Sequence, residues 1–202
     1  MRIVTQDTLG GPEVLRVTEA PRPEPGPTEV LVRVKAAGIN PVDLKVRRSG
    51  GFGAQPPFTI GWDVAGVVEK TGYGATGLRE GDEVLGMPWF PRPARAYAEY
   101  VTAPSRHFVR KPAGMSFTEA AALPLAGLTG WQSLFDIADL QPGQRVLVGA
   151  HSDLRWLPSI KQGGQLKVRV AHTFALGQVV DAHQLIESGR AHGKVVLIVD
   201  PD

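Results

Sequence analysis

The residues best suited to chemistry in this 202-residue sequence are Asn40 and Asp43, which flank Pro41. A strand pattern over Glu29–Ala37 precedes them, and Pro41 suits the first position of a helix because that position needs no backbone N–H. Polar side chains at such a corner can point into a cleft and orient a ligand by hydrogen bonds. An N-cap role for Asn40 and a first-turn role for Asp43 beside the helix dipole explain the same residues. Both interpretations stay open.

The remaining chemistry-bearing residues do not indicate a metal site. The sequence has no cysteine, which excludes disulfides, thiolate zinc ligands and a cysteine nucleophile. Its histidines lack paired ligand spacing; they are His107, His151, His172, His183 and His192. We interpret His107 and His172, which lie beside predicted strands, as structural or surface residues. Lys45 and Arg47 could bind an anion, but we interpret them as a solvated helix face.

Short strands separated by glycine and proline turns must position these residues. Strand patterns occupy residues 1–6, 13–19, 29–37, 63–70, 83–87, 96–102, 107–110, 145–148, 166–171 and 194–199. Helices are predicted from Pro41 to about Arg48, from the capping box Ser116-Phe-Thr-Glu119 to before Pro124, over 125–138 and over 177–188. The fold class expected from this pattern is mainly β with a few helices (α+β).

Composition and charge exclude several classes of function. The net charge is +2, and the charged residues are interspersed without a dense basic block, so no nucleic-acid partner is expected. No apolar run approaches the ~18 residues of a membrane span, and the first residues lack the apolar core of a signal peptide. We therefore expect a soluble, cytoplasmic chain with no membrane partner.

Several ordered stretches resemble the zinc-independent medium-chain dehydrogenase/reductase family, in its quinone oxidoreductase and enoyl reductase branch. They are residues 32–43, 57–68, 81–84, 120–132, 142–148 and 167–197. In that family a GroES-like, partly open β-barrel carries substrate residues, and an inserted Rossmann domain binds NADP(H). The resemblance therefore implies NADPH as cofactor, a small carbonyl or quinone substrate, and no zinc. In agreement, Gly61-Trp62-Asp63 stands where zinc-dependent relatives carry Gly-His-Glu.

The resemblance also assigns roles to individual residues. It implies that Asn40 and Asp43 lie at the nicotinamide and substrate end of the cleft as orienting groups, and that Thr129 and Asn40 contact the cofactor. Thr129 is also explained as a mid-helix threonine bonding back to a carbonyl one turn earlier. The tyrosines of some quinone reductase pockets are not found at 44–54, where the sequence has Leu44, Val46 and Phe52. The substrate class therefore stays open.

The Rossmann half of the family is not found in this sequence. Only 14 residues separate Ala150 from Gln165, whereas a single βαβ unit takes about 30. No G-x-G-x-x-G pattern follows Val148, and no acidic ribose ligand lies about 20 residues further on. We predict a GroES-like domain without a Rossmann domain, built from residues 1–150 and 165–202. A bridge over 151–164 joins them, with a short helix or turn at 153–161.

Three functions follow from this reading. The first is a truncated NADPH-dependent quinone or enone reductase that does not bind NADPH tightly or turn over alone. The second is a non-enzymatic GroES-like binding module, and the third is a half-enzyme completed by a separate nucleotide-binding domain. The helix over 125–138 would normally lie at the domain junction. We therefore expect self-association through its exposed surface or through the strand at 145–148.

Overall fold

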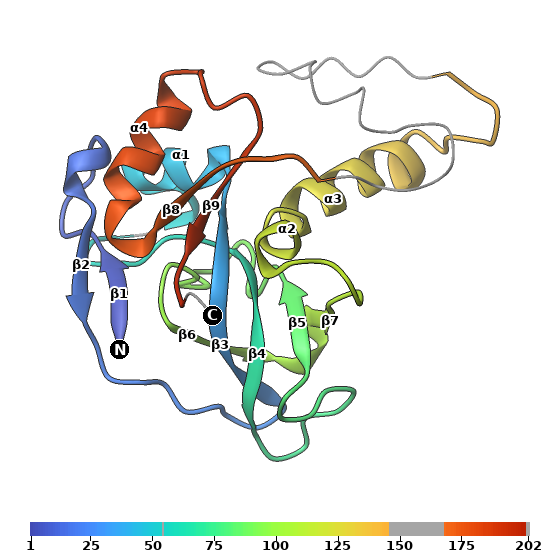
Figure 1. Ribbon diagram of the computed structural model, residues 1–202, viewed down its shortest axis with the longest axis horizontal. Helices are drawn as coiled ribbons and strands as arrows, with labels where there is room; N and C mark the ends of the chain where they lie inside the picture. Colours follow the sequence, from blue (N-terminus) through green and yellow to red (C-terminus); the bar gives the residue numbers. More distant parts are fainter. Residues whose placement is uncertain (54, 146–167, 201–202) are drawn as a thin grey trace.

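The computed structural model describes residues 1–53, 55–145 and 168–200 (Figure 1). The predicted strand at 145–148 falls almost wholly outside these ranges. The bridge over 151–164, with its helix or turn at 153–161, also lies outside the described residues. These three predictions, and the division into segments that rests on them, stay predictions.

Strand β3 (Glu29–Ile39) is the centre of the sheet. It pairs antiparallel with β4 (Asp63–Thr71) along most of its length, with β6 (Tyr100–Pro104) near its start and with β9 (Lys194–Ile198) near its end. The amino-terminal and carboxy-terminal parts of the chain therefore share one sheet. Three strands meet where β3 ends, immediately before Asn40.

The outer strands complete a seven-stranded mixed sheet. β5 (Glu83–Gly86) and β7 (Phe108–Arg110) continue it beyond β4, and β8 (Val170–Ala175) runs parallel to β9. β1 (Arg2–Thr5) and β2 (Arg16–Glu19) form a separate antiparallel pair. The expected α+β class, mainly β with a few helices, is confirmed, and the sheet of the described residues is open rather than closed.

The alternation of β3 explains its position. Val30, Val32 and Val34 are fully buried in the core, as their period-two spacing predicts. On the other face, Arg33 and Lys35 both form ion pairs with Asp200, which follows β9. Apolar burial and these edge charges together hold β9 against β3.

Four helices accompany the sheet in the described residues: α1 (Pro41–Ser49), α2 (Phe117–Ala121), α3 (Pro124–Trp131) and α4 (Val179–Glu187). The predicted capping box is confirmed, since the Ser116 hydroxyl accepts the Glu119 N–H and the Glu119 carboxylate accepts the Ser116 N–H. Single 3₁₀ turns lie at Pro12–Val14, Gly51–Gly53, Ser105–His107 and Leu176–Gln178. None of the described helices is long and apolar enough to cross a membrane.

The helix predicted over 125–138 is present as α3 followed by a wider π-helical segment, Gln132–Ile137. Figure 1 shows this helix extending from α2 away from the body of the sheet. Large apolar side chains along it are exposed to solvent: Leu128, Trp131, Phe135 and Ile137. We call these four residues the α3 face.

Candidate functional site

Asn40 lies at the corner between β3 and α1, where the sequence places it. Its backbone is extended, and Asp43 reaches back so that its Oδ2 accepts the Asn40 N–H at 2.7 Å. The helix-start interpretation therefore describes Asp43 correctly. The Asn40 side chain does not cap the helix but turns to other partners. Both residues are buried, with Asn40 2% exposed.

The Asn40 amide is bound by two charged residues from distant parts of the sequence. Its Nδ2 donates to Oδ2 of Asp63 at 2.8 Å, and its Oδ1 accepts from Nζ of Lys194 at 2.5 Å. Asp63 is the first residue of β4, opposite Gly38 of β3, and Lys194 is the first residue of β9. Asp63 also accepts the Leu125 N–H at 2.9 Å, which attaches the start of α3 to the same group.

Burial controls the electrostatics of this polar cluster. Desolvation raises the pKa of Asp43 to about 7, with a smaller contribution from the nearby charge of Asp63. Desolvation also raises the pKa of Asp63 and lowers that of Lys194, and the attraction between the two opposes both shifts. Because Lys194 lies 3.7 Å from the Asp63 carboxylate, the pair holds opposite charges in a nearly dry environment.

A second buried network lies beneath α1, and it shows that one prediction is wrong. Arg47 is fully buried rather than part of a solvated face, whereas Lys45 is exposed as predicted. The Arg47 guanidinium donates to the Gly10 carbonyl and to Glu187, and contacts His183 Nδ1 at 2.9 Å. Helix α4 packs here and supplies both His183 and Glu187, which a pattern confined to α1 cannot reveal.

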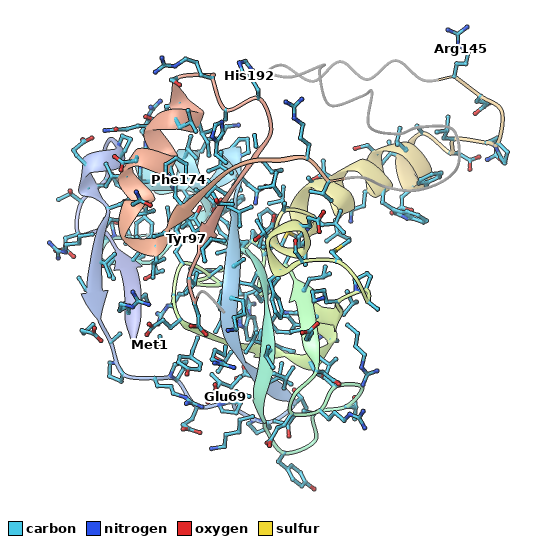
Figure 2. All side chains as sticks on the ribbon, viewed as in Figure 1. Met1, Glu69, Tyr97, Arg145, Phe174 and His192 are labelled. Carbon is cyan, nitrogen blue, oxygen red and sulfur yellow. The ribbon has the colours of Figure 1, made fainter. Side chains whose placement is uncertain are left out.

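Tyr97 lies between the two networks and is labelled in Figure 2. Its ring packs edge-on against His183, with 6.0 Å between the ring centroids. The charge of the Asp43 carboxylate raises the pKa of the Tyr97 hydroxyl further, in addition to the larger effect of burial. Burial lowers the pKa of His183 to about 3, with Arg47 acting in the same direction. His183 is therefore neutral at physiological pH and accepts from Arg47 through Nδ1.

An aromatic hollow lies around Trp62, the residue that precedes Asp63. Phe52, Trp62 and Phe90 contact one another edge to face, with centroid distances of 5.5 to 6.2 Å. The hollow is an open, shallow depression, and the enclosed space within it is only about 10 Å³. Its lining also includes Val46, Phe58, Thr59, Ile60, Pro91 and Pro93. Phe52 is 58% exposed, so one aromatic ring of the group is available to a ligand.

Thr129 and the histidines can now be placed. Thr129 is exposed on α3, one turn after Leu125 and on the same side of the helix. The back-bond to a carbonyl one turn earlier is not among the hydrogen bonds formed within the described residues. His172 is exposed, and His107 accepts the Trp89 N–H, so both are surface or structural as predicted. Among the described residues, no group of side chains is arranged to hold a metal ion.

Asp63 and Lys194 were not identified as site residues from the sequence. Each is a charged residue at the beginning of an apolar strand, Asp63 before Val-Ala-Gly-Val and Lys194 before Val-Val-Leu. That placement is the sequence signal that could have identified them. A charged residue on a strand that is buried on both faces has no contact with water and therefore needs a partner. The sequence cannot say that the two partners are each other.

The starts of the described α-helices are not arranged to hold nucleotide phosphates. Helix N-termini are the usual phosphate sites, because their free N–H groups point at the anion. Each described α-helix already carries a carboxylate at that end: Asp43 for α1, Glu119 for α2, Asp63 on the Leu125 N–H of α3, and Asp181 in the first turn of α4. A dinucleotide therefore does not fit these helix starts.

Comparison with known proteins identifies the family. The model of the alcohol dehydrogenase GroES-like domain matches residues 26–113, and that of the zinc-binding dehydrogenases matches residues 96–197, half of the chain. This chain belongs to the medium-chain dehydrogenase/reductase family. The resemblance predicted from the sequence is thereby confirmed, and the quinone oxidoreductases are among its relatives.

The relatives of this chain are longer than the chain itself. The mouse protein named synaptic vesicle membrane protein VAT-1 homolog-like is 38% identical over 150 residues, which is 73% of this chain and 35% of that protein. Human quinone oxidoreductase is 35% identical over 151 residues, which is 73% of this chain and 45% of that protein. The chain therefore spans less than half the length of these relatives.

The fold is that of solved members of the family. The structure of the Coxiella burnetii quinone oxidoreductase superposes with a TM-score of 0.82 at 22% identity, covering 99% of each chain. The structure of an NAD-dependent alcohol dehydrogenase superposes with a TM-score of 0.83 at 25% identity, covering 99% of this chain and 100% of that one.

Proposed function

We propose that this chain is the substrate side of a zinc-independent, NADPH-dependent quinone or enone reductase, and that it does not bind NADPH tightly or turn over alone. Residues 1–150 and 165–202 form one GroES-like domain, joined by a bridge over 151–164. The pairing of β9 with β3 supports this, because the carboxy-terminal segment returns to the sheet begun by the amino-terminal one. The carboxylates at the four helix starts support the loss of cofactor affinity.

The aromatic hollow is the observation that carries the substrate assignment. A quinone or a conjugated enone is planar and largely apolar, and it stacks on exposed aromatic faces with edge-to-face neighbours. Phe52 and Phe90 offer such exposed rings, and the buried Trp62 packs edge to face against both. Trp62 of the hollow directly precedes Asp63 of the cluster, which is the first residue of β4.

The polar residues take orienting roles in this proposal. Asn40 and Asp43 set hydrogen-bond directions from beneath the surface, and Thr129 and Asn40 contact the cofactor. NADPH, when bound, supplies the hydride. In the absence of zinc, polarisation of the carbonyl relies on preorganised hydrogen-bond donors, and the protein mainly positions two planar groups.

Calorimetric titration with 1,4-naphthoquinone tests the substrate assignment. We expect saturable binding to the full chain, weakened about tenfold by Phe52→Ala, because an aromatic contact contributes about 0.5–1.5 kcal/mol. Tyr73→Ala is the matched control, since Tyr73 is 93% exposed and absent from the hollow's lining. Equal weakening by both variants, or no saturation, would reject the hollow as the site. In a parallel titration, saturation by micromolar NADPH would contradict the proposed loss of cofactor affinity.

The α3 face favours a second proposal, self-association of the chain. Four large apolar side chains are exposed along this projecting helix, and exposed apolar groups of this kind are often covered in assemblies. A second copy of the chain is the proposed occupant. A separate nucleotide-binding domain that completes the enzyme at the same face is the alternative, and a pull-down with such a domain distinguishes the two.

A further inference from the structure

The orientation of the Asn40 amide is dictated by the chemistry of its partners. A lysine ammonium group can only donate hydrogen bonds, and an ionised carboxylate can only accept them. Lys194 therefore requires the amide oxygen on its side, at 2.5 Å, and Asp63 requires the amide nitrogen, at 2.8 Å. Rotating the amide by half a turn would place a donor against the ammonium group and an acceptor against the carboxylate.

Lys194 supplies the cation of this buried group. Its ammonium contacts Asn40 Oδ1, the Ile39 carbonyl at 3.3 Å and the Asp63 carboxylate at 3.7 Å. It is buried, and the groups that face it are Asn40, Asp63 and, through its charge, Asp43. Without the ammonium, Asn40 loses the donor on its oxygen and Asp63 loses its neighbouring cation.

With these two partners in place, the Asn40 side chain can donate a further hydrogen bond. One of the two Nδ2 hydrogens is taken by Asp63, and the oxygen faces Lys194, which leaves the second hydrogen as the donor that Asn40 can offer. We propose that Lys194 is a positioning residue that fixes Asn40 as a hydrogen-bond donor toward a carbonyl oxygen of the substrate. This role rests on the proposed quinone or enone reduction, whose substrates present such an acceptor.

The same contacts extend the role of Lys194 to α3. Asp63 holds the Leu125 N–H through its second oxygen, so the cluster attaches the beginning of α3 to the end of β3. Lys194 therefore positions both the proposed donor and the helix that carries Thr129. Strand β9, which delivers Lys194, comes from the other end of the chain.

Asn40 is the single asparagine of the 202 residues, which allows a direct test. In the full chain labelled with ¹⁵N-asparagine, one side-chain NH₂ pair is observed by NMR. We expect two well-separated proton shifts and slow exchange with water. Lys194→Met is expected to bring the shifts together and to speed exchange at least about tenfold, because the buried amide loses its fixed partner. Lys194→Arg should retain the separated pair, and Lys45→Met on the exposed side of α1 is the control.

The readouts separate this inference from the proposed function. Lys194→Met is expected to weaken naphthoquinone binding about tenfold while Lys45→Met leaves it unchanged. If the unmodified chain binds no quinone, the proposed function fails, and the NMR pair still decides whether Lys194 fixes the amide. An unchanged pair in Lys194→Met would overturn the inference. Should that variant not fold, rapid exchange of the pair in the unmodified chain would overturn it equally.

Discussion

The polar cluster and the α3 face are joined by one hydrogen bond yet differ completely in their surroundings. Asp63, which accepts the Leu125 N–H, is fully buried, whereas Ile137 at the far end of the same helix is 81% exposed. The cluster obtains all its partners from within the chain, from β3, β4, β9 and α1. The helix that leaves it has no such cover from the described residues. The partners of the cluster therefore all lie within the described residues, whereas the α3 face is left uncovered by them.

The largest expected effect concerns the pH dependence of the buried networks. The pKa of Asp43 is raised from 3.8 to about 7, so stability falls as pH rises through that window. The pKa of His183 is lowered from 6.5 to about 3, so stability falls as pH drops through that window. Where the two pH windows overlap, the two effects on stability oppose each other. The free energy of unfolding of the unmodified chain should therefore change little with pH in that range.

Urea unfolding between pH 3 and pH 8 tests this prediction. Asp43→Asn removes the loss of stability on raising the pH, and His183→Gln removes the loss on lowering it; each effect is on the order of several kcal/mol over its full window. The charged or titratable groups that face Asp43 are Tyr97, Asp63 and Lys194. Those that face His183 are Arg47 and Tyr97. Neither variant changes any of these neighbours. Stability profiles of the two variants that run parallel would show that at least one of the two groups does not titrate as described.

Arg47 provides the next largest effect and a matched comparison between buried and exposed charge. Arg47→Met should destabilise the chain by about 3–5 kcal/mol, because it leaves Glu187 and His183 without their buried cation. Arg48 pairs with the same Glu187 oxygen but is largely exposed, so Arg48→Met should change the free energy of unfolding by less than about 1 kcal/mol. Similar losses for both would mean that the burial of Arg47 does not matter.

A substitution in the α3 face should have the smallest effect on stability and the clearest effect on assembly. Trp131 is 61% exposed, so Trp131→Glu should leave the unfolding free energy nearly unchanged. If the face joins two copies, the same change should weaken their association by at least about 30-fold, as for a central interface aromatic. Sedimentation at several concentrations measures this, with Tyr73→Glu as the control. A monomer at every concentration in the unmodified chain would refute self-association.

The sequence by itself determined the local structure around the candidate site. Period-two alternation identified β3, Pro41 marked the start of α1, and the Ser116 and Glu119 pair marked the start of α2, because these signals act over a few residues. The ordered family motifs identified the family. Asn40 and Asp43 were found because they flank Pro41 at the strand-to-helix corner.

Only the tertiary structure decided which charged residues meet. Lys194 lies 154 residues from Asn40, and Glu187 lies 140 residues from Arg47. A helical pattern reports which residues share a face, and it placed Arg47 in solvent because no local signal shows that α4 will cover it. Burial changes the meaning of a charge, since an ion without water requires a partner. The partners of Asn40 and Arg47 are therefore set by strand order and helix packing, which join segments that no local pattern connects.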